Sequence, residues 1–239
     1  MAQENFQKNK WKEREEVATE KRKWVRLTRI CNNNCIFCLD KDNQNGTVIP
    51  FPEIESKLKS GRKQGCVRAI LSGGEPTLHP DYIRIIKRAK ELGYNYIQTV
   101  TNGRMFAYKK FLERCVEAGL NEITFTLPGH TKKLFEAQTR TKGSYEQTLK
   151  GVINALRAGL IVSADIVINK FTYKHLLKII KFYVNLGVRE FDLLQVMPYS
   201  NAWWNRKKVL YDVDKAYPCL LYTSPSPRDA HESRMPSSA

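Results

Sequence analysis

Apolar residues recur through the middle of this chain in two alternating patterns. Short runs rich in β-branched and aromatic residues predict strands at 24–27, 67–71, 96–101, 123–127, 161–168 and 191–196. Between several of these runs, apolar residues three and four positions apart fall on one face of a helix. Those faces are Tyr82, Ile85, Ile86 and Ala89; Phe111, Leu112, Cys115 and Val116; Leu149, Val152, Ile153 and Leu156; and Leu176, Ile179, Ile180 and Tyr183.

Glycine marks the expected end of each of these helices. Gly93, Gly119, Gly159 and Gly187 each stand shortly before the next strand, where a residue with positive φ commonly ends a helix. Strands that alternate with helices imply parallel pairing and right-handed crossovers. We therefore predict an α/β fold in which six strand–helix units form an incomplete (β/α)6 parallel barrel.

The composition bounds the size and the partners of this fold. The chain has 239 residues, 42% of them hydrophobic, which is enough for one sizeable core. No apolar run approaches the length of a membrane span, so we expect no membrane association. The formal net charge is +16, but Lys and Arg are spread over the polar helix faces. That distribution favours a solvated surface over a nucleic-acid partner.

Three cysteines lie within the short run from Cys31 to Cys38. A structural zinc site uses four Cys or His ligands, and an electron-transfer cluster uses four thiolates, so three ligands leave one coordination position open. The nearest downstream histidine, His79, is far away for a zinc knuckle. Residues 1–22 are crowded with charge and form no apolar leader, which predicts a cytoplasmic protein and disfavours a disulfide with a spare thiol.

The spacing Cys31-x3-Cys35-x2-Cys38, with Phe37 before the last cysteine, resembles the defining pattern of the radical S-adenosylmethionine (SAM) superfamily. The resemblance implies a [4Fe–4S] cluster held by these three cysteines. It also implies that the open iron chelates SAM through an amine and a carboxylate, and that Phe37 lies near the adenine.

A second motif, Gly73-Gly74-Glu75-Pro76, follows the strand at 67–71. Glycine lets a ligand approach the backbone closely, and the Glu75 carboxylate can accept a charge-assisted hydrogen bond from an ammonium group. The alternative is an ordinary Gly-Gly turn followed by an acid that caps a helix. In the superfamily, this segment resembles the element that binds the methionyl amino group of SAM.

Polar residues stand at other strand ends, where parallel barrels carry their chemistry. By resemblance, Thr101, Asn102 and Thr126 lie where family members contact the ribose or carboxylate of SAM, and Arg140 lies where many supply a carboxylate-binding cation. A Thr-Asn-Gly sequence is also common in simple turns, which remains the alternative for the first two. Leu127-Pro128 departs from the family pattern.

Three further residues receive structural interpretations. Cys66, at the start of a strand, and Cys115, on an apolar helix face, are expected to act as small buried hydrophobes. His130 is expected to be a polar loop residue and not a catalytic base.

The chain divides into four segments by composition. We predict a charged N-terminal extension at 1–22, a radical SAM core at 23–199, the start of a truncated C-terminal region at 200–218, and a non-native tail at 219–239. The tail is rich in Ser and Pro and lacks hydrophobic periodicity. It resembles the translated sequence of a sequencing adaptor.

The resemblance also implies an activity, with the maturase-like and molybdenum-cofactor-synthesis-like branches as the most similar. A reduced cluster would pass one electron to SAM, and the resulting 5′-deoxyadenosyl radical would abstract hydrogen from a peptide, protein or small-molecule substrate. An electron donor such as a flavodoxin or ferredoxin is the implied partner. The alternative is a non-catalytic iron–sulfur binding or electron-transfer module. Glu75 and its glycines argue against it, because an electron carrier has no use for an amino-acid site beside its cluster.

Overall fold

The computed structural model describes residues 20–216 of the chain. The predicted tail at 219–239 and most of the predicted extension at 1–22 lie outside the described residues. One parallel sheet has the strand order β1-β2-β3-β4-β5-β6. The strands are β1 (Arg22–Thr28), β2 (Arg68–Gly73), β3 (Tyr96–Thr101), β4 (Glu122–Thr126), β5 (Ile161–Ile168) and β6 (Glu190–Gln195).

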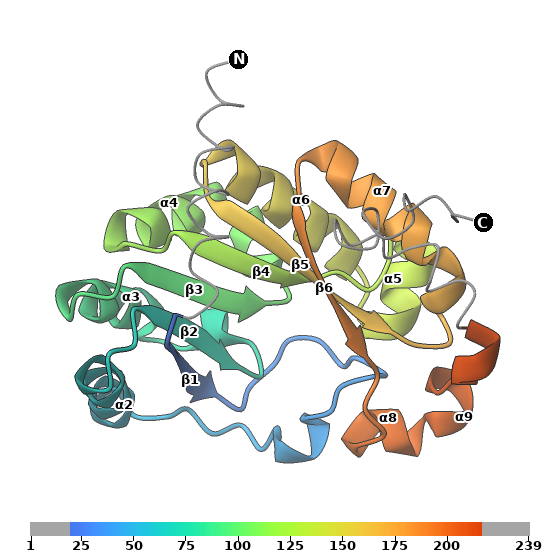
Figure 1. The fold of residues 1–239 in the computed structure, drawn as a ribbon, viewed down its shortest axis with the longest axis horizontal. Coiled ribbons are helices and arrows are strands. Elements are labelled where there is room, and N and C mark those ends of the chain that lie inside the picture. The colour runs from blue at the N-terminus through green and yellow to red at the C-terminus, as the bar shows by residue number, and fades with distance from the viewer. Residues whose placement is uncertain (1–19, 217–239) are drawn as a thin grey trace, which may run out of the picture.

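Helices cover the outer side of this sheet (Figure 1). The covering helices are α2 (Phe51–Lys63), α3 (Tyr82–Glu91), α4 (Lys109–Ala118), α6 (Ser144–Arg157) and α7 (Leu176–Leu186). Helix α5 (Lys132–Thr139) lies between β4 and α6 in the sequence, and α8 (Ser200–Trp204) and α9 (Arg206–Val209) follow β6. Short 3-10 helices follow the strands: η1 (Lys41–Asn43), η2 (Pro76–Leu78), η3 (Arg104–Ala107) and η4 (Tyr173–His175). Because each strand pairs with the next in sequence and the described residues show no pairing of β6 with β1, the barrel is incomplete, as predicted.

The strand boundaries follow the hydrophobic pattern closely. The bounds predicted for β3 and β5 are confirmed, and the other strands shift by one or two residues. Strand β1 begins at Arg22, inside the predicted extension. The reason is the buried Arg68 at the start of β2, which pairs with Glu20 and Glu122. A charged residue in this segment is therefore part of the packed structure.

The predicted glycine caps are confirmed. Gly93, Gly119, Gly159 and Gly187 have φ values of 84°, 118°, 72° and 113°, in the left-handed region that favours glycine. Cys66 and Cys115 are buried free thiols, as expected.

Helix α6 buries only part of the face that its apolar residues predict. Val152 is buried as expected, together with Ser144, Thr148 and Gly151, whereas Leu149 is only half-buried. A Cβ atom on Gly151 would lie 2.4 Å from the carbonyl oxygen of Gly103. The helix therefore approaches the turn after β3 so closely that small side chains, and not large apolar ones, must face it.

The inner face of the sheet is polar between β3 and β6. Gln98 Nε2 donates to Thr124 Oγ1 over 2.6 Å, and the hydroxyl groups of Thr124 and Ser163 lie 2.7 Å apart. Two residues after Ser163 on β5, Asp165 is in register with Asp192 on β6. Among residues 20–216, no helix is long and apolar enough to cross a membrane.

Candidate functional site

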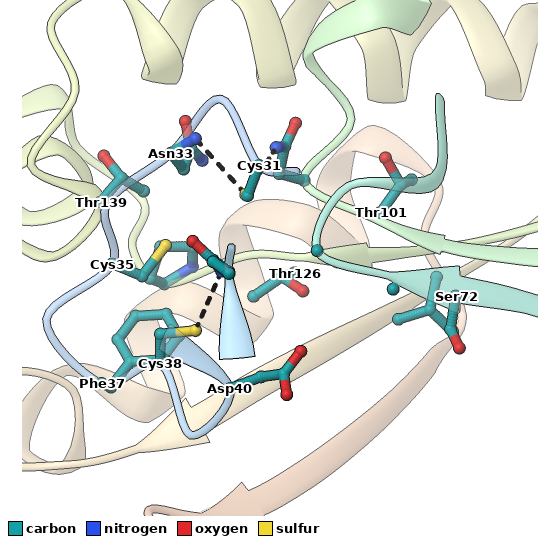
Figure 2. A pocket seen from close by; sticks show the side chains of 16 residues that line it. Cys31, Asn33, Cys35, Phe37, Cys38, Asp40, Ser72, Thr101, Thr126 and Thr139 are labelled. Carbon is teal, nitrogen blue, oxygen red and sulfur yellow. Dashed lines mark hydrogen bonds between the residues drawn. The ribbon is translucent and has the colours of Figure 1, made fainter. Parts of the chain in front are cut away.

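A pocket lies at the carboxyl ends of the strands, where the loops after β1 to β4 meet (Figure 2). Many of the predicted site residues line it. These are Cys31, Cys35, Phe37, Cys38, Gly73, Gly74, Thr101, Asn102 and Thr126. The pocket also includes residues that the sequence analysis did not select: Asn33, Asp40, Gln44, Ser72, Val100, Pro128 and Thr139.

The three cysteines present their thiols to this shared pocket, as Figure 2 shows. The backbone N–H of Asn33 donates to Cys31 Sγ over 3.4 Å, and Gln44 Nε2 donates to Cys38 Sγ over 3.6 Å. Burial raises the pKa of Cys31 to about 11. Burial also raises the pKa of Cys35 and Cys38 above that of an ordinary thiol, and the nearby Lys41 charge opposes the shift at Cys38.

This donor set fits an iron–sulfur cluster. Thiolates are the ligands that such clusters prefer, and N–H groups directed at the sulfurs are typical of their surroundings. Burial favours the protonated thiols, and each thiol would lose its proton when it binds iron. Within residues 20–216, no three His, Cys, Asp or Glu side chains are placed to hold a single metal ion. In a cluster, each thiolate would bind its own iron.

Helix α5 holds one side of the cysteine loop. The N–H groups of Asn34 and Ile36 donate to the carbonyl oxygens of Thr139 and Gln138, over 3.1 and 2.7 Å. These bonds attach the loop to the last turn of α5. The conformation of the segment between Cys31 and Cys38 is therefore set by α5 as well as by the turns within the segment.

The segment after β3 holds the other side of the loop. Asn102 Nδ2 donates to Asn32 Oδ1 over 2.6 Å, and Arg104 Nη1 donates to Asn33 Oδ1 over 3.1 Å. Arg104 also donates to the carbonyl oxygen of Asn32. The run of asparagines is thus anchored by specific partners, and Arg104 is a site residue that the sequence analysis missed.

Helix α8 packs over the same loop. Asn201 Nδ2 donates to the carbonyl oxygen of Cys35 over 2.9 Å, and the Asn201 N–H donates to that of Cys38 over 3.1 Å. A small apolar cluster joins the two segments: Ile36, Phe37, Val196, Ala202 and Val209. The packing therefore continues without a break across the predicted boundary between 23–199 and 200–218, and Figure 1 shows the loop after β1 reaching toward α8.

The two motif glycines allow the β2 loop to pack against the backbone that follows β1. A Cβ on Gly73 would lie 2.5 Å from the oxygen of Thr28, and one on Gly74 would lie 2.4 Å from that of Ile30. Gly73 also has φ of 147°. The close approach that requires glycine is therefore backbone to backbone, while the same residues also form part of the pocket wall.

Glu75 lies behind the pocket wall, not on its surface. Its carboxylate is fully buried and accepts hydrogen bonds from Thr101 Oγ1 at 2.6 Å, from the Asn102 N–H at 2.8 Å, and from Thr77. Burial raises its pKa, and these donors oppose the shift. Both carboxylate oxygens accept hydrogen bonds within the protein, so Glu75 connects the loops after β2 and β3. Its side chain also accepts from the Thr77 N–H at the start of η2, which is the capping role of the alternative interpretation. A bond to a ligand ammonium group stays a prediction.

Arg140 and His130 lie outside the pocket lining. Arg140 is the left-handed C-cap of α5, with φ of 51°; its side chain is exposed, and its charge lowers the pKa of Cys35 against the larger effect of burial. His130 packs near His175 and Phe182, with ring centroids 6.1 and 6.4 Å away. It lies in a loop, as expected, and does not line the pocket; that it is not a catalytic base stays a prediction.

Comparison with protein families gives an independent result. The family model described as the radical SAM superfamily matches residues 25–183. A Saccharolobus solfataricus protein named "Probable GTP 3′,8-cyclase" is 30% identical over 176 residues, which cover 73% of this chain and 56% of that protein. A Sulfurisphaera tokodaii protein of the same name is also 30% identical, with 73% and 55% covered. The chain thus spans little more than half the length of these relatives.

Solved structures share the fold at lower identity. SuiB from Streptococcus suis, bound to its precursor peptide SuiA, superimposes with a TM-score of 0.70 and 17% identity, covering 90% of this chain and 47% of SuiB. Methylornithine synthase (PylB) gives a TM-score of 0.63 and 16% identity, covering 75% of this chain and 54% of PylB.

Proposed function

Because the chain belongs to the radical SAM superfamily, we propose that Cys31, Cys35 and Cys38 hold a [4Fe–4S] cluster and that the adjoining pocket binds SAM. When bound, the cluster and SAM together supply a 5′-deoxyadenosyl radical for hydrogen abstraction. The observation that carries the proposal is the pocket itself, in which three thiols, and no fourth among residues 20–216, lie with Gly73 and Gly74.

The protein's own contribution is to bind and orient. Asn102, Arg104 and Asn201 fix the path of the cysteine loop through hydrogen bonds to its side chains and carbonyls. Phe37 is 8% exposed and lines the pocket, which supports a role against the adenine. Thr126 also lines the pocket and provides a hydroxyl group for a polar part of SAM.

Two residues support SAM from outside the lining. Glu75 orients Thr101 and Asn102, which both line the pocket. Arg140 places a positive charge near Cys35, and we assign it to the carboxylate of SAM. This is the role that the family resemblance implies for it.

The substrate that we propose is a peptide, a protein or a small molecule. SuiB was solved with a precursor peptide, whereas the curated relatives are named for a cyclase that acts on GTP. An external electron donor such as a flavodoxin or ferredoxin would reduce the cluster, and the reducing cytoplasm suits three unpaired thiols. A non-catalytic electron-transfer module is the alternative, and the SAM cleavage assay separates the two.

The test is SAM cleavage by the anaerobically reconstituted chain with dithionite as reductant. We expect iron and sulfide in the ratio of one four-iron cluster, together with slow release of 5′-deoxyadenosine. Cys35→Ala should abolish both, while Cys66→Ala, a matched change at a buried thiol away from the pocket, should retain both. Stoichiometric zinc without sulfide, or a complete cluster that never cleaves SAM, would contradict the proposal.

A further inference from the structure

A short chain of hydrogen bonds connects Lys41 to a cysteine of the pocket. Lys41 Nζ donates to Gln44 Oε1 over 3.2 Å, and Gln44 Nε2 donates to Cys38 Sγ over 3.6 Å. The bond at Cys38 is one of the dashed lines in Figure 2. Lys41 begins η1 and Gln44 caps it through a backbone bond of 3.0 Å, so one tight turn sets the spacing of the two side chains.

Lys41 determines which end of the Gln44 amide faces the sulfur. An ammonium group has donors and no acceptor, so the amide must turn its oxygen toward Lys41. The NH2 group is then left for Cys38. This assignment follows from the chemistry of the three groups and does not depend on distinguishing the amide oxygen from the nitrogen by position.

The turn that carries this chain is itself held at both ends. Asp40, just before η1, forms an ion pair with Arg26 of β1, and the Asp42 N–H donates to Ser200 Oγ over 2.9 Å. The donor is therefore attached to the first strand and to α8, and its position relative to Cys38 is set by packed elements.

Hydrogen bonds to cluster sulfurs favour the reduced state, because reduction adds negative charge that the donors stabilise. On the basis of the proposed function, we propose that Gln44, oriented by Lys41, raises the reduction potential of the cluster through Cys38. Gln44 is thus a positioning residue that acts through a ligand. The relevant step is the one-electron reduction of the oxidised cluster, with the electron supplied by dithionite.

The test is a redox titration of the reconstituted full chain, followed by the EPR signal of the reduced cluster. Gln44→Leu removes the donor at similar size, and we expect its equilibrium constant for reduction to fall about threefold to tenfold, or about 28 to 59 mV for one electron. Lys41→Met should shift the potential in the same direction by less. A potential for Gln44→Leu equal to that of the unaltered chain, at full cluster content, would overturn the proposal.

A double-variant cycle separates the hydrogen-bonded chain from the charge of Lys41 acting through space. If Lys41 acts by orienting the amide, Lys41→Met should have a smaller effect in the Gln44→Leu background than alone; equal effects would overturn the role of Lys41. Arg29→Met is the matched control, because Arg29 also contacts η1, through the Asn43 carbonyl at 3.5 Å, without touching the amide. Its shift should be smaller than that of Lys41→Met.

Two outcomes need a further measurement. If Gln44→Leu loses iron, Gln44→Glu keeps the size and should lower the potential further, because a carboxylate would face the sulfur. If neither variant retains four irons, the reduction potentials of Lys41→Met and Arg29→Met are compared. A larger shift in potential for Lys41→Met supports the proposal, and equal shifts overturn it. Failure of the proposed function is distinguishable, because the unaltered chain would then show no four-iron cluster or no response to SAM.

Discussion

Replacing Glu75 with alanine tests what the motif carboxylate does. The change deletes the acceptor for Thr101 Oγ1 at 2.6 Å and for the Asn102 N–H at 2.8 Å, and also that for Thr77. Each bond to a charged acceptor contributes about 1.5 to 3 kcal/mol, and a buried donor left unpaired costs about 1 to 3 kcal/mol. Removing the buried charge also relieves its desolvation cost. We therefore expect the free energy of unfolding to fall by about 2 to 4 kcal/mol.

The same change should weaken SAM binding while the cluster remains. Thr101 and Asn102 line the pocket, and without Glu75 they lose the group that fixes them. We expect a loss of about 1.5 to 3 kcal/mol, which is about tenfold to 150-fold in Kd. Denaturant unfolding and an anaerobic SAM titration measure the two effects, and Glu75→Gln, which keeps the shape of the side chain, should give smaller losses in both.

An analogue of SAM without its amino group separates two mechanisms. If Glu75 positions the loop, Glu75→Ala weakens SAM and the analogue alike. If Glu75 instead pairs with the ammonium group, the variant weakens SAM alone and leaves stability nearly unchanged. That second result would refute the reasoning from the buried hydrogen bonds.

Three further predictions concern the fold around the site. Burial, together with Asp192, raises the pKa of Asp165 from 3.8 to about 7. Because the folded state holds this proton more tightly, Asp165 makes a contribution to folding stability that is present below about pH 3.8 and is lost as pH rises through about 7. Asp165→Asn should therefore reduce the fall in Tm between pH 5 and 8, and an unchanged fall would contradict the shift. Asn201→Ala removes a bond to the Cys35 carbonyl and should speed loss of cluster iron to a chelator severalfold, whereas an unchanged rate would show that α8 does not hold the loop. Gly74→Ala would place a Cβ 2.4 Å from the Ile30 oxygen and should cost about 1 to 3 kcal/mol in denaturant unfolding; full stability would show that the loop can move.

The parts of this molecule that the sequence predicted are those with local causes. Strand and helix positions follow from the spacing of apolar residues, and Gly119 and Gly187 end their helices because of a backbone conformation that glycine favours. The three cysteines could be selected because their spacing is itself the motif. None of these features depends on a distant partner.

The parts that the sequence did not predict depend on distant residues. Arg104 contacts Asn32 across 72 positions, and Asn201 contacts Cys35 across 166, and no local pattern marks either residue. The position of Glu75 behind the wall depends in the same way on Thr101, 26 residues later. Its chemical type predicted a strong acceptor, but only the fold shows which donors it meets.

The most direct test of the central claim is the EPR spectrum of the reduced cluster with and without SAM. Under the proposed function, three cysteine ligands leave one iron open, so SAM should bind to that iron and change the spectrum. The change should be absent when SAM is replaced by 5′-methylthioadenosine, which lacks the amino and carboxylate groups that would bind the iron. An identical spectrum with and without SAM, at saturating concentration and full cluster content, would contradict the account and indicate a cluster that serves only in electron transfer.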